Sequence, residues 1–261
     1  MSAIVTLTTD FGTCDPYVGA LKGALLAVVR QLHLLDLSHD IPPQDVLAGA
    51  FVLRHAAFEF PADTVHLAVV DPGVGGARRA LAVDAGGYRW VAPDNGLLSC
   101  ALAFPGARAF EITHPELRRE SLSATFHGRD LFAPAAARLA AGFPVESVGP
   151  RVDDAVLLAA TQAVVQGACL VGSIIHADHF GNLISCISGN DLDSFGDRAR
   201  LRVVAGDVTV HGIVRTYTDV DAGEPAALIG SGNLLELVLR EGSAAARFGL
   251  QRGDRITVER S

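Results

Sequence analysis

The sequence predicts an α/β fold with two parts: an N-terminal α/β domain whose mostly parallel sheet is covered by helices, and a smaller C-terminal antiparallel β-barrel domain. Up to about residue 150, short apolar runs alternate with segments of helical spacing, which is typical of a parallel sheet covered on both faces. Further along, helical spacing fades and short β-rich runs separated by Gly or Asp take over, as in small barrels. We place the boundary near residue 163, giving domains 1–163 and 164–261.

The composition is that of a globular protein that binds neither nucleic acid nor membrane. Of 261 residues, 49% are hydrophobic and 19% charged, which suits a large buried core. The net charge of -8 and the lack of a clustered basic face argue against a nucleic-acid partner. No apolar run is long enough to span a membrane, and no signal peptide is recognisable. We therefore expect a cytoplasmic protein whose four cysteines, none in a C-x-x-C pair, are reduced.

The chain opens with a predicted strand at residues 4–8, followed by a loop and a helix that reaches about residue 30. Asp15 followed by Pro16 is typical of a helix start, with the carboxylate as N-cap. Asp10 directly follows the strand, at the sheet edge where ligands bind in open α/β sheets. Two interpretations stay open: these carboxylates face a ligand, or Asp10 closes a turn and Asp15 only caps.

The sequence V-D-P-G-V-G-G-A-R-R, residues 70–79, follows a buried strand predicted at 65–70. Three glycines within four residues let a ligand approach the main chain closely. Asp71 therefore lies at the carboxyl end of a strand, and Arg78 brings a permanent positive charge back toward it. The alternative is a strand-to-strand turn closed by an exposed ion pair.

The other elements of the first domain follow from the same patterns. They are a strand at 32–37, a helix at 46–57 and a hairpin of 80–84 and 88–92. The segment P-D-N-G-L-L (93–98) follows the hairpin and precedes a helix. Its carboxylate and amide either face a ligand or complete a plain turn. In T-F-H-G-R-D-L-F-A-P (125–134), Asp130 is predicted to cap a helix reaching about residue 141. His127 then lies in the preceding loop, as either a chemical group or a structural histidine.

The second domain is predicted from seven short strands and two segments that interrupt them. The strands are 169–175, 183–187, 201–204, 208–214, 226–229, 234–239 and 255–259. The interruptions are H-A-D-H-F-G-N (176–182) and G-S-G-N-L-L-E (230–236). Phe180 and Asn182 offer an aromatic face and an amide suited to a purine base. His176, Asp178 and His179 have metal-like types but crowded spacing and no fourth partner, so we predict no metal site.

Six motifs occur in order across nearly the whole chain: T-D-F-G, D-P-G-V-G-x-x-R, P-D-N-G-L-L, T-F-H-G-R-D, D-H-F-G-N and G-S-G-N-x-L-E. Each is weak alone, but their ordered succession is specific. Together they resemble the S-adenosyl-L-methionine (SAM) hydroxide adenosyltransferases, relatives of the SAM-dependent fluorinase and chlorinase. The resemblance implies a homotrimer in which SAM lies between the N-terminal domain of one subunit and the C-terminal domain of its neighbour.

The resemblance also assigns substrate contacts to positions of this chain. It implies that Asp10 binds the ribose hydroxyls, that Asp15 pairs with the methionine ammonium, and that Ser231 binds the methionine carboxylate. It also implies that the adenine end is held by Phe180 and Asn182, with Asp178 nearby, and by backbone groups around Leu239 and Glu241. Glu236 closes the last motif and is included among the substrate-binding candidates. Adenosine and SAM are thus the expected ligands, with SAM as the substrate and no cofactor.

The reacting centre separates hydrolytic from halogenating members of the family. The halogenating members carry tyrosines at the positions of Asp71 and His127 and lack the arginine matching Arg78, whereas the hydrolytic members carry the Asp, Arg and His found here. The resemblance therefore implies attack of water on the ribose C5′ carbon, with release of adenosine and L-methionine. We hypothesise that His127 accepts the proton of that water and Asp71 aligns it.

Three other functions stay open from the sequence alone. One is a SAM-dependent halogenase, and another is a SAM- or adenosine-binding sensor without turnover. The third is a metal hydrolase built on His176 and His179.

Overall fold

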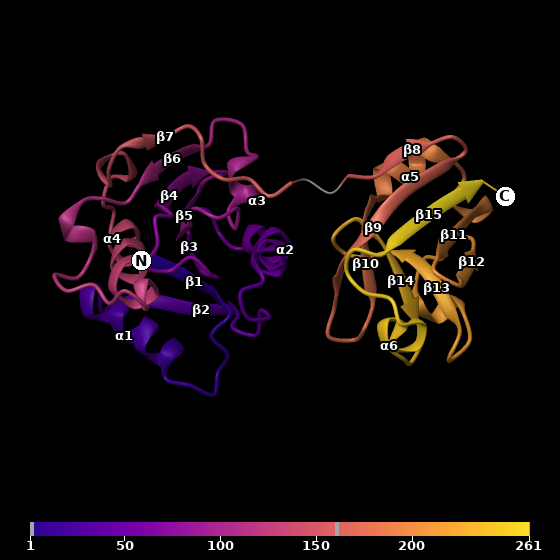
Figure 1. The fold of residues 1–261 in the computed structure, drawn as a ribbon, viewed down its shortest axis with the longest axis horizontal. Helices are drawn as coiled ribbons and strands as arrows, with labels where there is room; N and C mark the ends of the chain where they lie inside the picture. The colour runs from indigo at the N-terminus through magenta and orange to yellow at the C-terminus, as the bar shows by residue number, and fades with distance from the viewer. Residues whose placement is uncertain (1–2, 160–161, 261) are drawn as a thin grey trace. The chain divides into compact units, whose positions relative to one another are not determined.

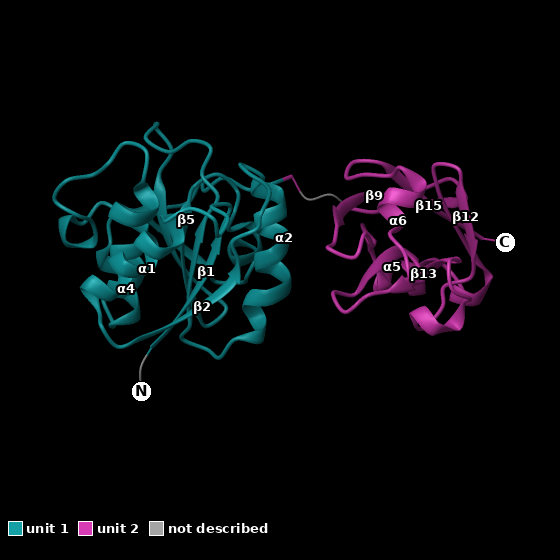
Figure 2. Cartoon of the chain, turned by 90° about the horizontal axis from the view of Figure 1, so that it is seen from below, with its two compact units in different colours: residues 1–158 teal, residues 159–261 magenta. Residues whose placement is uncertain are grey.

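The computed structural model describes residues 3–159 and 162–260. The chain forms two compact units, Met1–Leu158 and Ala159–Ser261 (Figure 2). The hydrophobic cores of the first unit are separate from that of the second. The division falls close to residue 163, where the sequence pattern changes. The α/β class and the antiparallel barrel predicted from the sequence are confirmed.

The first unit is built on a seven-stranded mixed sheet in the order β2-β1-β3-β5-β4-β6-β7 (Figure 1). Strands β2, β1, β3 and β5 are parallel, while β4, β6 and β7 extend the sheet in antiparallel pairs. Their bounds are β1 Ala3–Thr9, β2 Leu32–Ser38, β3 Val65–Val69, β4 Ala80–Ala85, β5 Tyr88–Pro93, β6 Arg108–Glu111 and β7 Arg151–Val152. Thr9 of β1 is paired with Val69 of β3, so Asp10 and Val70 leave the sheet side by side.

Helices cover both faces of this sheet (Figure 1). Helices α1 (Tyr17–Val28) and α4 (Ala133–Ala140) pack their apolar residues with the strands in one core, and α2 (Val46–Ala56) and α3 (Ser99–Leu102) do so in a second. All five residues of β3 are buried, as expected of a strand covered on both faces. Asp45 caps α2 by accepting a hydrogen bond from the Ala48 amide at 3.0 Å.

Two predicted helix caps are wrong. Pro16 occupies the N-cap position of α1 without a side-chain hydrogen bond, so Asp15 does not cap that helix. The helix expected from Asp130 begins earlier, with a π-helical turn at Gly128–Phe132 that leads into α4. The Asp130 carboxylate, 1% exposed, instead accepts hydrogen bonds from Arg129 and from the Ser123 amide at 2.9 Å, and these partners lower its pKa.

The second unit is an eight-stranded, nearly closed antiparallel sheet in the order β12-β11-β15-β9-β10-β14-β13, with β8 paired to β9. Its strands are β8 Val164–Gln166, β9 Cys169–Ala177, β10 Leu183–Ser188, β11 Leu201–Ala205, β12 Val208–His211, β13 Pro225–Ile229, β14 Leu234–Leu239 and β15 Arg255–Arg260, with helices α5 Gly189–Phe195 and α6 Ala244–Phe248. An isolated bridge from Val214 to Leu228 joins the two edges of this sheet. Within the described residues, no helix is both long and apolar enough to cross a membrane.

Candidate active site

Asp71 and Arg78 form a bidentate pair at the carboxyl end of β3. The Arg78 Nε atom donates to Oδ1 and Oδ2 of Asp71 at 3.0 and 3.1 Å, and Nη2 donates to Oδ2 at 2.5 Å. The two side chains are only 5% and 11% exposed. Charged hydrogen bonds of this fork geometry are strong and directional, so the pair fixes the direction of the guanidinium.

His127 completes the cluster from a distant part of the chain. Nη2 of Arg78 lies 2.8 Å from Nδ1 of His127. Because a guanidinium can only donate, Nδ1 accepts, and the neutral ring then carries its hydrogen on Nε2. Burial lowers the pKa of His127, the Arg78 charge lowers it further, and Asp71 and Asp130 act in the opposite direction. The lowered pKa favours the neutral ring.

A glycine allows the two loops of this cluster to meet. Gly75 has a φ of +76°, and a Cβ there would collide with the carbonyl oxygen of Ala124, just before the T-F-H-G motif. The Arg78 guanidinium also lies over the Phe132 ring, 5.1 Å from its centroid, in the helical turn that follows His127. Backbone approach and ring contact thus bring residues 49 positions apart in sequence into one cluster.

Asp10 leaves the sheet beside Val70, the residue before Asp71, because β1 and β3 are neighbouring parallel strands. Its Oδ2 atom accepts a hydrogen bond from the Gln44 amide at 2.7 Å. Gln44 holds a left-handed backbone conformation, with φ of 66°, which turns its N–H toward the carboxylate. Gln44 could not be predicted from the sequence, since a backbone donor leaves no side-chain signature.

Three aromatic side chains hold the loops of the first unit together. The rings of Phe11, Tyr17 and Phe126 contact one another edge to face, with centroids 5.5 to 6.2 Å apart. Each lies within two residues of a predicted site residue, so the T-D-F-G, D-P-Y and T-F-H-G segments meet at one edge of the sheet. Asp15 itself is exposed at this edge.

In the second unit, Asp178 organises the turn between β9 and β10. Its Oδ1 atom accepts from the amides of Phe180 and Asn182 at 2.9 and 2.8 Å, and its Oδ2 atom accepts from the Asn182 side-chain amide at 2.9 Å. Asp178 therefore fixes the orientation of the Asn182 amide. Phe180 projects from the same turn with 74% of its surface exposed.

Glu236 lies buried on β14 beside this turn. A Cβ at Gly230 would collide with its Oε1 atom, so the glycine makes room for the carboxyl group. Burial, and secondly the Asp178 charge, raise the pKa of Glu236. Burial and the charges of Glu236 and Asp178 also raise the pKa of Tyr217, an exposed aromatic residue that the sequence analysis missed. In the sequence, Tyr217 is marked only by being an aromatic residue within R-T-Y-T-D (215–219).

The remaining candidates of the second unit lie in turns. Ser231 is exposed in the turn before β14, and Leu239 and Glu241 lie where that strand ends. Within the described residues, no three His, Cys, Asp or Glu side chains are arranged to hold a metal ion, including those around His176 and His179.

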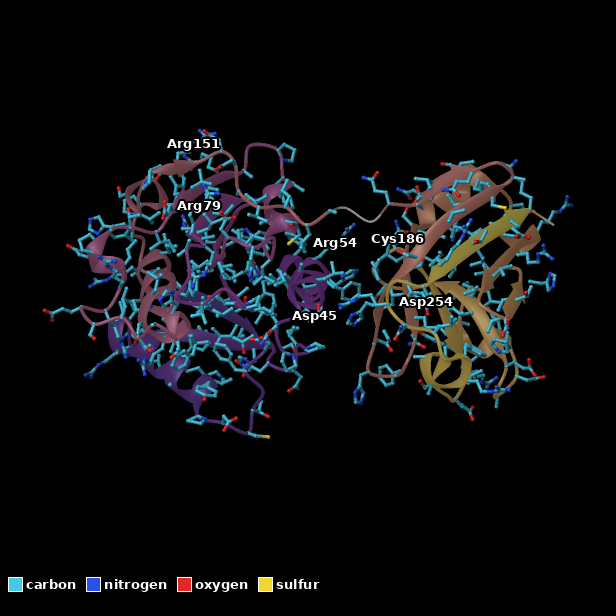
Figure 3. All side chains as sticks on the ribbon, in the orientation of Figure 1. Asp45, Arg54, Arg79, Arg151, Cys186 and Asp254 are labelled. Atoms are coloured by element: carbon cyan, nitrogen blue, oxygen red, sulfur yellow. The ribbon has the colours of Figure 1, made fainter. Side chains whose placement is uncertain are left out.

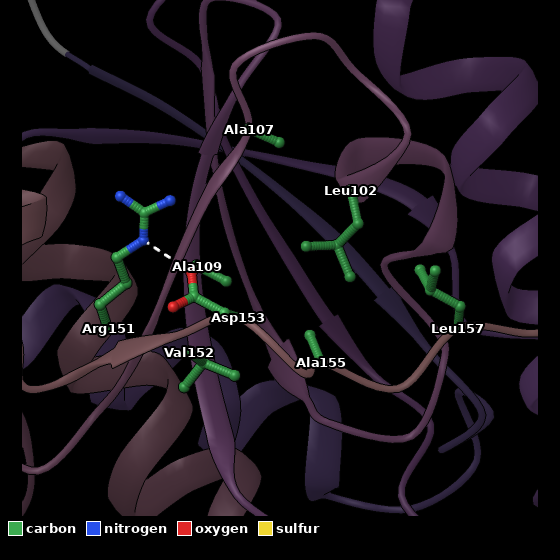
Figure 4. Close-up of a pocket in the computed structure, with 8 residues that line it drawn as sticks. All are labelled: Leu102, Ala107, Ala109, Arg151, Val152, Asp153, Ala155 and Leu157. Atoms are coloured by element: carbon green, nitrogen blue, oxygen red, sulfur yellow. Dashed lines mark hydrogen bonds and ion pairs between the residues drawn. The ribbon is translucent and has the colours of Figure 1, made fainter.

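A pocket of about 190 Å³ lies apart from these residues, along β6 and β7 in the first unit (Figure 4). Its lining includes Leu102, Val152 and Leu157, with Arg151 and Asp153 paired at its rim. It contains none of the residues predicted from the sequence.

Comparison with known proteins identifies the family. Models of the N-terminal and C-terminal domains of SAM hydroxide adenosyltransferases match residues 5–149 and 172–257. (R)-S-adenosyl-L-methionine hydrolases are similar: that of Salinispora tropica is 40% identical over 97% of each chain, and that of Thermus thermophilus is 39% identical over 95% of this chain and 96% of its own. A fluorinase from Actinopolyspora mzabensis is 29% identical over 99% of this chain and 97% of its own.

The fold comparison agrees. The crystal structure of an uncharacterized conserved protein from Thermotoga maritima has a TM-score of 0.91 at 34% identity, covering 98% of this chain and 100% of that one. The chain therefore belongs to the SAM hydroxide adenosyltransferase family, as its ordered motifs predict.

Proposed function

We propose that this protein hydrolyses SAM to adenosine and L-methionine. The relatives at 39–40% identity are named SAM hydrolases, whereas the fluorinase is 29% identical. The hydrogen bonds that join Asp71, Arg78 and His127 favour hydrolysis over halogenation. These donors and acceptors suit a water molecule that must be oriented and deprotonated, which a halide does not require.

The proposed reaction is an in-line displacement at the ribose C5′ carbon. The water oxygen forms a bond to C5′ while the C5′–S bond breaks and its electron pair stays on sulfur. Methionine leaves as a neutral thioether, so no general acid is needed. The site has only to generate the nucleophile and aim it.

We propose that the water inserts between Nη2 of Arg78 and Nδ1 of His127. The hydrogen bond of Nη2 then passes from the ring to the water oxygen, and Nδ1 becomes free to accept the proton of the water. The lowered pKa of His127 supports this role, because only the neutral ring can accept. The fixed Arg78 charge stabilises the developing hydroxide, and Asp71 holds Arg78 in place.

The substrate anchors are proposed by position in the family motifs. Asp10 would accept hydrogen bonds from the two ribose hydroxyls. Asp15 would pair with the methionine ammonium, and Ser231 would bind the methionine carboxylate. The Gln44 amide supports the assignment of Asp10, since it fixes that carboxylate before substrate arrives.

The adenine end is proposed to lie in the second unit. Phe180 and Tyr217 would supply aromatic faces and Asn182 an amide held by Asp178, with Glu236 beside them. The exposure of the Phe180 and Tyr217 side chains supports this assignment, because exposed aromatic faces in the same unit as fixed polar groups suit a flat, polar base.

We infer further that the active enzyme is a cytoplasmic homotrimer that completes its sites at subunit interfaces, as the family resemblance implies. Light scattering would measure its mass.

The reaction is proposed to need no metal or redox cofactor because the leaving group is neutral. Full activity in excess chelator is the expected result, and loss of activity would favour the metal hydrolase.

Incubation with SAM, followed by chromatography and mass spectrometry, tests the proposed function. Adenosine and methionine should accumulate together, with or without added chloride or fluoride. A halogenated nucleoside would make the protein a halogenase. SAM that binds yet stays intact over hours would make it a sensor.

A further inference from the structure

The P-D-N-G turn, residues 93–96, holds both ends of the loop that carries Asp71 and Arg78. It begins at the last residue of β5, which lies beside β3 in the sheet. From the sequence, its carboxylate and amide have two possible roles, a ligand contact or a plain turn. In the structure, Asp94 and Asn95 contact the loop at residues 70–79 instead.

Asn95 fixes the first end of this loop. Its Nδ2 atom donates to the carbonyl oxygen of Val70 at 2.8 Å, and its Oδ1 atom accepts from the Leu97 amide at 3.2 Å. The pairing of β3 with β5 runs from Val65 to Leu67, so this hydrogen bond holds Val70 beyond the paired stretch. Val70 directly precedes Asp71, and its position decides where the carboxylate leaves the sheet.

Asp94 fixes the second end. Its amide donates to the carbonyl oxygen of Arg79 at 3.0 Å, and its Oδ2 atom accepts from Nε of Arg79 at 2.7 Å. Arg79, labelled in Figure 3, directly follows Arg78 and precedes β4. The Asp94 carboxylate is 3% exposed, and its Oδ1 atom accepts from the Val156 amide at 2.8 Å. Both of its oxygens thus have protein partners.

We infer that Asp94 and Asn95 are positioning residues for the reacting set of Asp71, Arg78 and His127. The loop between the two anchors contains three glycines within four residues, which have more backbone freedom than other residues would. The hydrogen bonds at its two ends therefore set the position of the Asp71–Arg78 pair, and through Nη2 the contact with His127. Reacting groups displaced by about 1 Å can lose two orders of magnitude in rate. The inference rests on the proposed function.

The substitution Asn95→Asp tests it with little change of shape. The ionised side chain still accepts from the Leu97 amide but cannot donate to the Val70 carbonyl. We expect kcat for SAM to fall by about tenfold to a hundredfold while KM changes by less than about threefold, because the substrate anchors lie on other loops. The ratio of variant to wild-type kcat should rise as the pH falls and the introduced carboxyl group regains a proton to donate.

Thr64→Val is the matched control. Thr64 is buried just before β3, and its hydroxyl donates to the Pro61 carbonyl at 2.7 Å, away from the loop. This variant should lose a similar amount of thermal stability with kcat unchanged. Equal losses of kcat in both variants, or a raised KM with unchanged kcat in Asn95→Asp, would overturn the inference.

A second readout does not depend on turnover. The ¹⁵N NMR signal of His127 Nδ1, assigned by its absence in His127→Asn, reports the hydrogen bond from Arg78. Asn95→Asp should shift it and Thr64→Val should not; no shift in Asn95→Asp would contradict positioning. Should Asn95→Asp fail to fold, Asp94→Asn, which weakens the bond to Arg79, is expected to give the same shift. Wild-type protein that leaves SAM intact would refute the proposed function while this test of positioning still applies.

Discussion

Nη2 of Arg78 donates to Nδ1 of His127 across 2.8 Å, while the same nitrogen donates to Asp71. The imidazole and the carboxylate are therefore both hydrogen-bonded to one guanidinium. Nδ1 can take up a proton only when that contact opens, and we propose that a water molecule opens it by supplying both a donor and an acceptor.

His127→Asn should lower kcat by about 10²- to 10⁴-fold with a smaller effect on KM, because the amide can accept from Arg78 but cannot take a proton near neutral pH. Single-turnover kinetics would measure the chemical step. Near wild-type turnover in His127→Asn together with abolished turnover in Asp71→Asn would assign the proton to Asp71 instead.

The pH dependence of the wild type gives a separate check on His127. Only the neutral ring accepts a proton, so kcat/KM, which reports the free enzyme, should rise with pH through the pKa of this group. Burial and Arg78 lower that pKa, which places the half-maximal point below 6.5. A half-maximal point well above pH 7 would contradict the assignment.

Arg78→Lys should reduce kcat/KM by about 10²- to 10³-fold although the charge is kept. A lysine cannot hold both Asp71 oxygens and still donate to His127 from one planar fork. Arg89→Lys is the control, because Arg89 pairs with the exposed Asp63 at 3.4 Å. Steady-state kinetics of the two variants should differ sharply, and similar values would argue against a geometric role.

Asp10→Asn should raise KM for SAM by about tenfold or more, since one of the two oxygens proposed to accept ribose hydroxyls becomes a donor. The effect on kcat should be smaller. Asp40→Asn provides a comparison at an exposed carboxylate in a neighbouring loop. Calorimetric titration with adenosine would measure the affinity directly, and unchanged affinity in Asp10→Asn would remove this anchor.

The buried His66 is expected to make the free energy of unfolding depend on pH. It is buried in β3, hydrogen-bonded to Thr6 at 2.7 Å, and burial lowers its pKa to about 4. Between about pH 6.5 and 4 the unfolded chain binds a proton that the folded chain does not. The free energy of unfolding should therefore fall by about 3 kcal/mol as the pH drops through this range.

Urea unfolding at several pH values would measure this dependence. His66→Gln can keep a hydrogen bond to Thr6 without titrating, so it should show a flatter pH dependence. A variant as pH-sensitive as the wild type would show that other groups dominate.

Much of the fold could be predicted from local patterns. Buried apolar runs gave the strands that frame the site, and Leu234–Leu239 agrees with the structure at both ends. Strand β7, Arg151–Val152, has only two residues and too little pattern to detect. The contact of Asp71 with Arg78 was predictable because both residues flank one glycine-rich turn after a buried strand.

The errors come from contacts that helix-capping rules do not include. Capping rules consider only the hydrogen bonds that a carboxylate can accept from backbone amides in the next turn. Asp130 accepts from Arg129 and Ser123, and its side chain also lies 3.3 Å from Arg119, so this set of contacts outweighs a cap. Gln44 holds Asp10 through a backbone amide 34 residues away, a distance in sequence that no motif spans.

The isotopic label of the adenosine product tests the central claim most directly. SAM is incubated with the protein in water enriched in ¹⁸O, and both products are analysed by mass spectrometry. Attack of water on C5′ predicts one ¹⁸O atom in the 5′-hydroxyl of adenosine and none in methionine. Unlabelled adenosine, or label in methionine, would contradict the claim that water held by Arg78 and His127 is the nucleophile.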